Sequence, residues 1–284
     1  MTGLTALKVV ELESEAYHNA ELTEQVLVKG KPGYAAPVLG WQAHIVYPGL
    51  QNFVQSLKES RNAGLEYFPG KGQTLYERLT QDKFKEQVFQ DAMSALSSQA
   101  NSFLPQVISL SEYKHVVDAG GGDGTNALAL ARAFSEVRFS VFDSPSVCAI
   151  AQKKISEAGL SDRVRIWEGD FFTGPFPEDV DCVLFSHILT IFSMDRNTAL
   201  LKRVHASLPE GGAVIVFNMM GNDDESGPLS TALGSPYFLA IATGEGMLHP
   251  WKDYESALRE AGFAEIRRVS DNLPLAHGIL VARK

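Results

Sequence analysis

From Lys114 onward, short apolar runs alternate with helical segments, and this alternation limits the folds open to the chain. The apolar runs end in glycine, aspartate or a turn, whereas the helical segments carry apolar residues at intervals of three and four. Strands that alternate with helices build a mostly parallel sheet covered by helices on both faces. We expect strands at 115–120, 138–143, 164–170, 181–189 and 213–220, and helices at 126–134, 146–159, 197–208 and 251–263. Two final strands, 265–271 and 277–283, have no helix between them and predict an antiparallel pair at the end of the sheet.

The residues before Lys114 indicate mainly helix. A long amphipathic helix is expected to begin at Asp82, because apolar residues between Phe84 and Phe103 fall mostly on one stripe. Residues 1–35 predict a short helix, a hairpin and another short helix. We therefore expect a smaller, mainly helical domain over 1–80 and an α/β domain over 81–284.

Composition and charge favour a small-molecule partner over nucleic acid or a membrane. The formal net charge is −9, from 34 Asp and Glu against 25 Lys and Arg, and this sign repels phosphate backbones and anionic lipid surfaces. No apolar stretch reaches transmembrane length, and the N-terminus lacks a basic-then-apolar signal. Cys148 and Cys182 have no metal-type spacing and indicate reduced thiols. We expect a cytoplasmic protein without a metal.

The turn after the first α/β strand carries Gly120, Gly122 and Gly124 in the stretch "VVDAGGGDG". Glycines there let the backbone turn sharply and let a ligand approach main-chain N–H groups. A dinucleotide fingerprint starting at Gly120 would need glycine at position 125, which is Thr125. The observed G-x-G-x-G spacing is instead common among S-adenosylmethionine enzymes. A tight turn with a purely structural need for glycine is the alternative.

Acidic residues end the next two strands. Asp143 can accept both ribose hydroxyls of a nucleoside, while Asp170 can face an adenine amino group and Phe171 can pack on the ring. Ligands of open α/β sheets bind at the carboxyl ends of strands, which is where these groups fall. Helix capping explains Asp143 or Asp170 singly but explains the set poorly. Together with Asp118 of the glycine stretch, they predict a nucleoside-type cofactor site.

The stretches "VVDAGGGDG", "FD", "GDFF", "LPEGGAVIV" and "REAGF" resemble the S-adenosylmethionine-dependent O-methyltransferase family that includes caffeate, acetylserotonin and bacterial antibiotic-tailoring enzymes. The resemblance covers residues 80–284 closely and 1–80 loosely. It implies a doubly wound, Rossmann-like methyltransferase sheet, S-adenosyl-L-methionine as cofactor and a winged-helix dimerisation domain. The stretch "ALKVVELESEAYHNAEL" looks like the last helix and wing of that domain. We expect the domain to be shortened and any homodimer interface to be smaller or altered.

In this family, a motif of the form L-H-D-W follows the fourth strand, and its histidine deprotonates the acceptor hydroxyl. On this sequence Thr190 falls at the histidine, Ile191 at the aspartate and Phe192 at the tryptophan. Threonine cannot act as a base near neutral pH. Ser186 replaces the lysine or arginine that contacts adenine in the family, so the resemblance places it at the cofactor. His187 is either a catalytic group or a semi-buried histidine bonded to backbone.

Another base is expected from the stretch "GEGMLHPWKDYESAL". It places His249 before a helix that follows a substrate-lining loop in the family, with Tyr237, Phe238 and Met247 as an apolar wall. His249 is either a base or substrate anchor, or a histidine at a helix entry, since Pro250 follows it.

The sequence thus predicts a methyltransferase that acts on a small secondary-metabolite acceptor. Loss of the usual histidine favours an acceptor that is already nucleophilic, such as a carbon, an acidic enol or an amine, because orientation alone lowers the barrier substantially. Two alternatives remain open: a methyltransferase fold that catalyses a non-methylating step, pericyclic or hydroxylating, and a non-catalytic binding protein.

Overall fold

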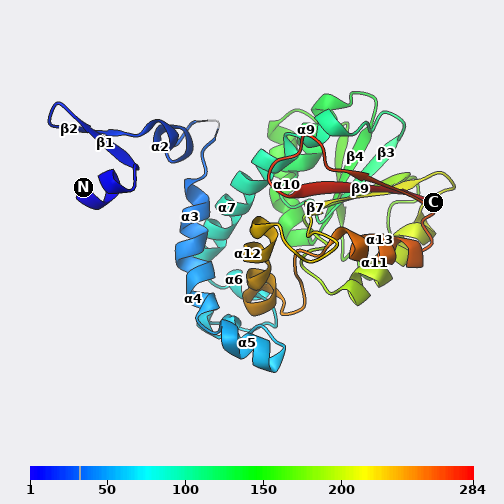
Figure 1. Cartoon of the computed structure of the whole chain (residues 1–284). Coiled ribbons are helices and arrows are strands. Elements are labelled where there is room, and N and C mark those ends of the chain that lie inside the picture. Colours follow the sequence, from blue (N-terminus) through cyan, green and yellow to red (C-terminus); the bar gives the residue numbers. More distant parts are fainter. Residues whose placement is uncertain (32) are drawn as a thin grey trace.

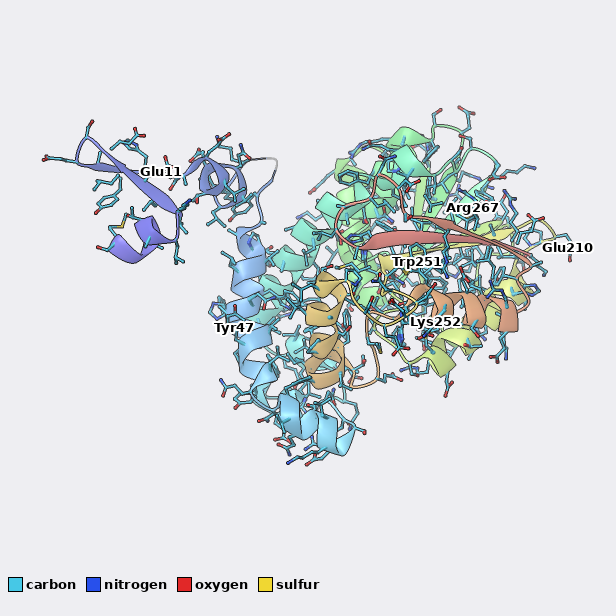
Figure 2. All side chains as sticks on the ribbon, in the orientation of Figure 1. Glu11, Tyr47, Glu210, Trp251, Lys252 and Arg267 are labelled. Atoms are coloured by element: carbon cyan, nitrogen blue, oxygen red, sulfur yellow. The ribbon has the colours of Figure 1, made fainter. Side chains whose placement is uncertain are left out.

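The computed structural model describes residues 1–31 and 33–284, without the side chain of Gln99; Pro32, inside the segment expected to form the first helices and hairpin, lies outside the described residues. An N-terminal arm stands apart from the rest of the chain, with Glu11 on its hairpin (Figures 1 and 2). The arm consists of α1 (Thr2–Ala6), β1 (Val10–Glu13), β2 (Ala16–Asn19) and α2 (Glu21–Val26), with β1 antiparallel to β2. The expected order of helix, hairpin and helix is therefore confirmed.

A helical segment follows the arm and packs beside the sheet (Figure 1). Its elements are α3 (Ala36–Trp41), the π-helical turn η1 (Gln42–Val46), α4 (Tyr47–Leu50), α5 (Phe53–Glu59), the 3₁₀ turn η2 (Ala63–Tyr67), α6 (Leu75–Leu79), α7 (Lys83–Asn101) and α8 (Leu104–Val107). The predicted long helix begins where expected, because the Asp82 carboxylate caps it by accepting the Lys85 N–H at 3.1 Å. Tyr47 projects into solvent from this segment (Figure 2).

The α/β part is a seven-stranded sheet in the order β5-β4-β3-β6-β7-β9-β8. Its strands are β3 (His115–Ala119), β4 (Arg138–Asp143), β5 (Val164–Glu168), β6 (Cys182–Ser186), β7 (Ala213–Met219), β8 (Glu265–Val269) and β9 (His277–Arg283). The strands β3 to β7 are parallel, whereas β9 is antiparallel to both β7 and β8, as the sequence predicted. The chain passes from β3 outward to β5 and then back to β6, so the switch point lies between β3 and β6. Ligands of such sheets bind at this point, beyond the carboxyl ends of the strands.

Helices cover both faces of the sheet. They are α9 (Thr125–Ala133), α10 (Pro145–Glu157), α11 (Met194–Ser207) and α13 (Trp251–Glu260), and α12 (Leu229–Tyr237) with the π-helical turn η3 (Phe238–Ala242) is inserted between β7 and α13. One buried cluster includes Leu130 and Ile155, and a second, on the other face, includes Leu200 and Leu258. A third cluster joins the helical segment to Ile241 of η3. The insertion therefore holds the helical segment against the α/β part.

Among the residues described, no helix combines the length and apolar character needed to cross a membrane.

Candidate cofactor and acceptor site

The glycine loop between β3 and α9 has the backbone that its sequence predicts. Gly120, Gly122 and Gly124 adopt φ values of 73°, 58° and 79°, in the left-handed region that favours glycine. A Cβ at Gly120 would also collide with the side chain of Ile188, which lies just beyond β6. By contrast, a Cβ at Gly122 would meet nothing within 4 Å. The loop is thus packed at its start and open at its tip, at the switch point of the sheet.

Asp143 reaches this loop from the end of β4. One carboxylate oxygen accepts the Gly122 N–H at 3.0 Å, and the other accepts the Ser144 N–H at 2.7 Å. Burial raises the pKa of Asp143, and these two N–H groups oppose that shift. Each oxygen keeps acceptor capacity after one bond, so the carboxylate can still receive ribose hydroxyls.

Asp118 lies beneath the same loop with unsatisfied hydrogen-bonding capacity. Both of its oxygens are buried and make no hydrogen bond of ordinary geometry among the described residues, and the same holds for the amide of Asn126. The Asn126 amide and the Ala127 N–H lie near enough to lower the pKa of Asp118, but less than burial raises it. Burial, with a smaller contribution from Asp143, raises the pKa of Asp118 to about 7. Buried polar groups without partners carry a large free-energy cost, which a bound polar ligand would remove. Their location at the glycine loop fits a cofactor with amine and hydroxyl groups.

Asp170 and Phe171 follow β5 on the same side of the sheet. Asp170 is exposed and closes a turn, accepting the Phe172 N–H at 2.8 Å and the Thr173 hydroxyl at 3.0 Å. Phe171 belongs to an aromatic cluster with Phe142, Phe172, Phe185 and Phe192. This cluster offers an apolar wall for a flat ring beside the Asp143 carboxylate.

Ser186 ends β6, and the ring of His187, the next residue, points toward β7 and β9. Its Nε2 lies 3.0 Å from Nε2 of His277, at the start of β9, and its ring packs on Phe217. Its Nδ1 lies 3.1 Å from the Ser186 hydroxyl, which also donates to Asn101 at 3.3 Å. Burial, with a smaller contribution from His277, lowers the pKa of His187 to about 3. The partners of His187 are therefore side chains rather than the backbone groups considered from sequence.

No sequence pattern indicates the pairing of His187 with His277. Pairing depends on register: β6 aligns Ser186 with Phe217, and β9 aligns His277 with Met219. Only the antiparallel return of β9 places the two imidazoles together.

Thr190 is 2% exposed, and its hydroxyl donates to the backbone oxygen of His187 at 3.2 Å. This hydroxyl stabilises the turn after β6. His249 is also buried, at 6% exposure, and its Nε2 lies 3.4 Å from the backbone oxygen of Phe192. Its Nδ1 lies 4.0 Å from the Asp253 carboxylate. The fold thus brings His249 to the stretch that carries Thr190, and its role as a base stays a prediction.

Sequence reasoning missed three further residues that join these segments. Arg196, in the first turn of α11, forms an ion pair with Glu245 at 2.5 Å. The Thr243 hydroxyl donates to the backbone oxygen of Ile191, also at 2.5 Å. No sequence spacing links positions about fifty residues apart, so only the folded chain shows these contacts.

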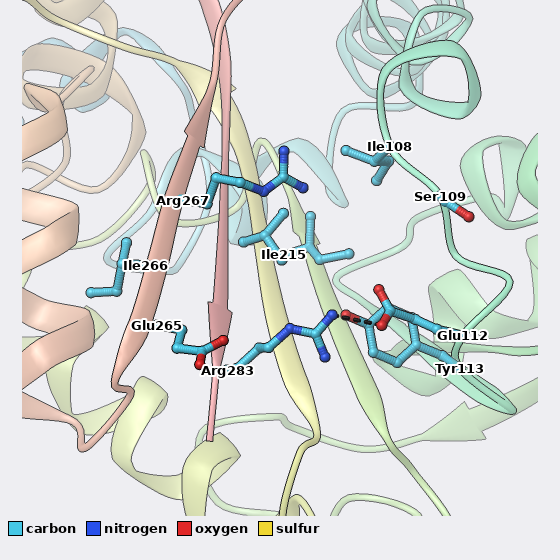
Figure 3. A pocket seen from close by; sticks show the side chains of 10 residues that line it. Ile108, Ser109, Glu112, Tyr113, Ile215, Glu265, Ile266, Arg267 and Arg283 are labelled. Atoms are coloured by element: carbon cyan, nitrogen blue, oxygen red, sulfur yellow. Dashed lines mark hydrogen bonds and ion pairs between the residues drawn. The ribbon is translucent and has the colours of Figure 1, made fainter.

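Two cavities lie elsewhere and carry none of the predicted site residues. One, of about 230 Å³, lies between residues 108–113 and strands β7 to β9, and there Arg283 pairs with Glu112 at 2.6 Å (Figure 3). Because Arg283 aligns with Ala213 at the start of β7, this cavity faces the opposite end of the parallel strands from the glycine loop. The other, of about 810 Å³, lies between residues near Lys29 and the outer side of α7. The glycine loop, with its unpaired buried groups, therefore remains the candidate site. Within the described part of the chain, no group of three or more His, Cys, Asp or Glu side chains could hold a metal ion.

Comparisons with known proteins match this arrangement. A family model described as an O-methyltransferase domain matches residues 47–264. The L-tyrosine C(3)-methyltransferase of Streptomyces lavendulae is 36% identical over 286 residues, covering 100% of this chain and 78% of that protein. Among solved structures, the apo form of the S-adenosylmethionine-dependent methyltransferase SibL gives a TM-score of 0.84 at 36% identity, covering 100% of this chain and 83% of that one. Human N-acetylserotonin methyltransferase in complex with S-adenosylmethionine has the same fold, with a TM-score of 0.89 at 24% identity over 100% of this chain and 81% of that one.

Proposed function

The chain belongs to the O-methyltransferase family and is an S-adenosyl-L-methionine-dependent methyltransferase of secondary metabolism, and from that premise we propose that it methylates a ring carbon beside the hydroxyl of a phenolic amino acid such as tyrosine. The proposal rests on one observation: a buried threonine, Thr190, occupies the position where the family has its catalytic histidine. The similarity to a tyrosine C(3)-methyltransferase supports the same acceptor class.

The residues at the switch point fit the cofactor. Asp143 would accept the ribose hydroxyls, Phe171 would pack on the adenine, and the unpaired Asp118 carboxylate would face the polar end of the molecule. We assign Gly120, Gly122, Asp170 and Ser186 to the same site. When bound, S-adenosylmethionine supplies a methyl group activated by its positively charged sulfur. The protein holds acceptor and donor in line, which by itself removes several kcal/mol from the barrier.

Carbon is the acceptor atom that suits a site without the family's histidine. Methylation at oxygen requires a base at that oxygen, and the Thr190 hydroxyl is instead donated to the His187 carbonyl. The carbon next to a phenol oxygen is a nucleophile in its own right, because the oxygen delivers electron density to it. As the carbon–carbon bond forms, the bond between the methyl group and the cofactor sulfur would break and leave S-adenosylhomocysteine, and the proton of the same ring carbon must leave to restore aromaticity.

We assign the removal of that ring proton to His249. Burial lowers the pKa of His249, so the ring is neutral and able to accept a proton at neutral pH. The Asp253 carboxylate at 4.0 Å would stabilise the resulting cation.

The test is product analysis with L-tyrosine and S-adenosylmethionine. We expect the product to gain one methyl group, to lose one aromatic proton signal and to show an aryl-methyl signal in its NMR spectrum. A methoxy signal with all ring protons retained would contradict carbon methylation.

Asp143→Ala should weaken cofactor binding about 10- to 100-fold, since a charge-assisted bond contributes about 1.5–3 kcal/mol. Asp143→Asn, which keeps the side-chain shape, is the matched control for charge.

Three broader assignments complete the proposal. The domain boundary lies at 80/81, which is supported by the capped start of α7 at Lys83. Small molecules rather than nucleic acids are the partners, which is supported by the net charge of −9. We also assign a homodimer, on the grounds of the exposed apolar residues of the arm.

A further inference from the structure

We infer that Arg196 is a positioning residue that couples the occupied cofactor site to the loop Thr243–His249, which carries the proposed base. This inference rests on the proposed placement of the cofactor adenine against Phe171. It concerns a side chain that no part of the proposed chemistry uses.

Arg196 contacts the aromatic wall through the faces of two rings. Its guanidinium lies 4.4 Å from the ring centre of Phe172 and 4.6 Å from that of Phe192. The two rings also contact each other edge to face, with centroids 4.7 Å apart, and Phe171 lies 5.1 Å from Phe172. A flat ring that packs on Phe171 would therefore fix the rings that hold Arg196.

On its other side Arg196 holds the loop Thr243–His249. Its Nη1 donates to Glu245 at 2.5 Å, at the middle of that loop. A guanidinium stacked on two rings has little freedom, so it fixes the Glu245 carboxylate more firmly than a flexible lysine would.

Further contacts tie the same two segments together. The Thr243 hydroxyl bonds to the Ile191 oxygen at 2.5 Å, and His249 Nε2 lies 3.4 Å from the Phe192 oxygen. At Gly246 the backbones approach so closely that a Cβ would collide with the carbonyl oxygens of Thr190 and Ile191. The loop is thus held at its start, centre and end against the stretch Thr190–Phe192, and Arg196 is the side chain that links Glu245 to the ring faces of the aromatic wall.

The coupling makes the binding of the cofactor and the binding of the acceptor mutually favourable. With the cofactor in place, the rings, Arg196 and Glu245 would hold the loop in the conformation that presents His249 to the acceptor. Without it, the ring contacts of Arg196 loosen and the loop is less ordered, so the acceptor binds more weakly. By linkage, the acceptor would strengthen cofactor binding by the same factor.

The first test uses hydrogen–deuterium exchange of the full chain with S-adenosylhomocysteine and needs no acceptor. We expect this ligand to slow exchange in residues 120–124 and in residues 243–249 of the wild type. In Arg196→Met, which keeps apolar contact with the rings but loses the charge, protection of 243–249 should fall about 5-fold or more, while that of 120–124 remains. Glu245→Gln should behave like Arg196→Met, and Arg196→Lys should restore part of the protection.

Lys202→Met is the matched control, because Lys202 lies on the same helix and pairs with Glu260 at 2.8 Å, away from the loop. It should leave both segments unchanged. Equal protection of 243–249 in wild type and Arg196→Met would overturn the coupling. Absence of protection at 120–124 in the wild type would instead refute the proposed cofactor placement, and with it the coupling.

Kinetics provide the second readout. With L-tyrosine as acceptor, Arg196→Met should raise KM for tyrosine about 5-fold or more with little change in cofactor affinity. A fall in kcat with KM unchanged would contradict a positioning role, as would a loss in melting temperature as large as the change in activity.

Discussion

At the scale of single residues, we assign the role of base to His249 and not to Thr190. We expect Thr190→Ala to change turnover little, because its hydroxyl is occupied by the His187 carbonyl. His249→Ala should lower turnover by about 10²-fold, the low end for loss of a positioned acid–base group. The measurement is turnover at saturating cofactor, with melting temperature recorded for each variant.

His249→Gln separates proton transfer from hydrogen bonding, since glutamine can still donate to the Phe192 oxygen but cannot accept a proton at neutral pH. If His249→Gln retains full turnover, His249 only fixes the loop. If Thr190→Ala abolishes methyl transfer while His249→Ala is silent, the threonine orients the acceptor and the assignment is wrong.

Site residues could be predicted from sequence where the backbone geometry requires a particular residue type. They were harder to predict where their role depends on contacts with side chains from other segments. The glycines of the loop were predictable because a sharp strand-to-helix turn needs left-handed φ values, which glycine adopts without strain. Asp118 was part of a recognisable motif, yet its lack of a partner is visible only in three dimensions. Arg196 was not predictable at all, because its partners come from three separate segments.

At the scale of elements, His187 on β6 and His277 on β9 make the junction of these strands sensitive to acid. The folded pKa of His187, about 3, lies below the value near 6.5 of an unfolded histidine, and burial lowers the pKa of His277 as well. Below pH 6.5 the unfolded chain binds protons that the folded chain does not, so the free energy of unfolding falls as pH falls. Between the unfolded and folded pKa values the loss from His187 is about 1.4 kcal/mol per pH unit, His277 adds a loss in the same direction, and the contribution of the pair is constant above about pH 7.5.

Urea denaturation between pH 5 and 8 tests this, with His187→Asn as the comparison. Asparagine tolerates the φ of 60° found at this position, so the variant removes the titrating ring with little added backbone strain. We expect a shallower decline of stability with acid in the variant than in the wild type. Identical slopes would show that this histidine pair does not control the acid response.

Element order and type were readable from the sequence for a physical reason. Parallel strands buried on both faces form continuous apolar runs, and the helices between them carry one apolar stripe, so the two patterns differ clearly. The packing of the insertion α12–η3 was harder to predict from sequence, because it contacts the helical segment before the sheet rather than its neighbours in sequence. Its packing against residues such as Leu75 could not be deduced from local periodicity.

At the scale of the whole molecule, the arm presents apolar side chains without intrachain cover. Leu7 and Leu22 are 74% and 68% exposed, on an arm that stands apart from the main body (Figure 1). We expect the protein to self-associate through them, and Leu7→Glu with Leu22→Glu to weaken association by about tenfold or more, which corresponds to about 1.4 kcal/mol.

Sedimentation over a concentration series provides the measurement. Leu275→Glu is the control, because Leu275 is equally open to solvent, at 82% exposure, but lies near β9 instead of on the arm. A monomer for the wild type at the highest concentration would contradict self-association, and equal effects of the control would contradict the role of the arm.

The position of β9 has a consequence for synthesis on the ribosome. Although β9 follows every other strand along the sequence, it lies inside the sheet, between β7 and β8. The strands around the cofactor, β3 to β6, can pair as soon as they leave the exit tunnel, since the chain between His115 and Ser186 contains all of them. But β7 and β8 stay unjoined until residues 277–283 have emerged, so the nascent chain exposes two open strand edges until translation has passed this point. Chaperones that shield strand edges would act on this protein until β9 has emerged, at the side of the sheet farthest from β5.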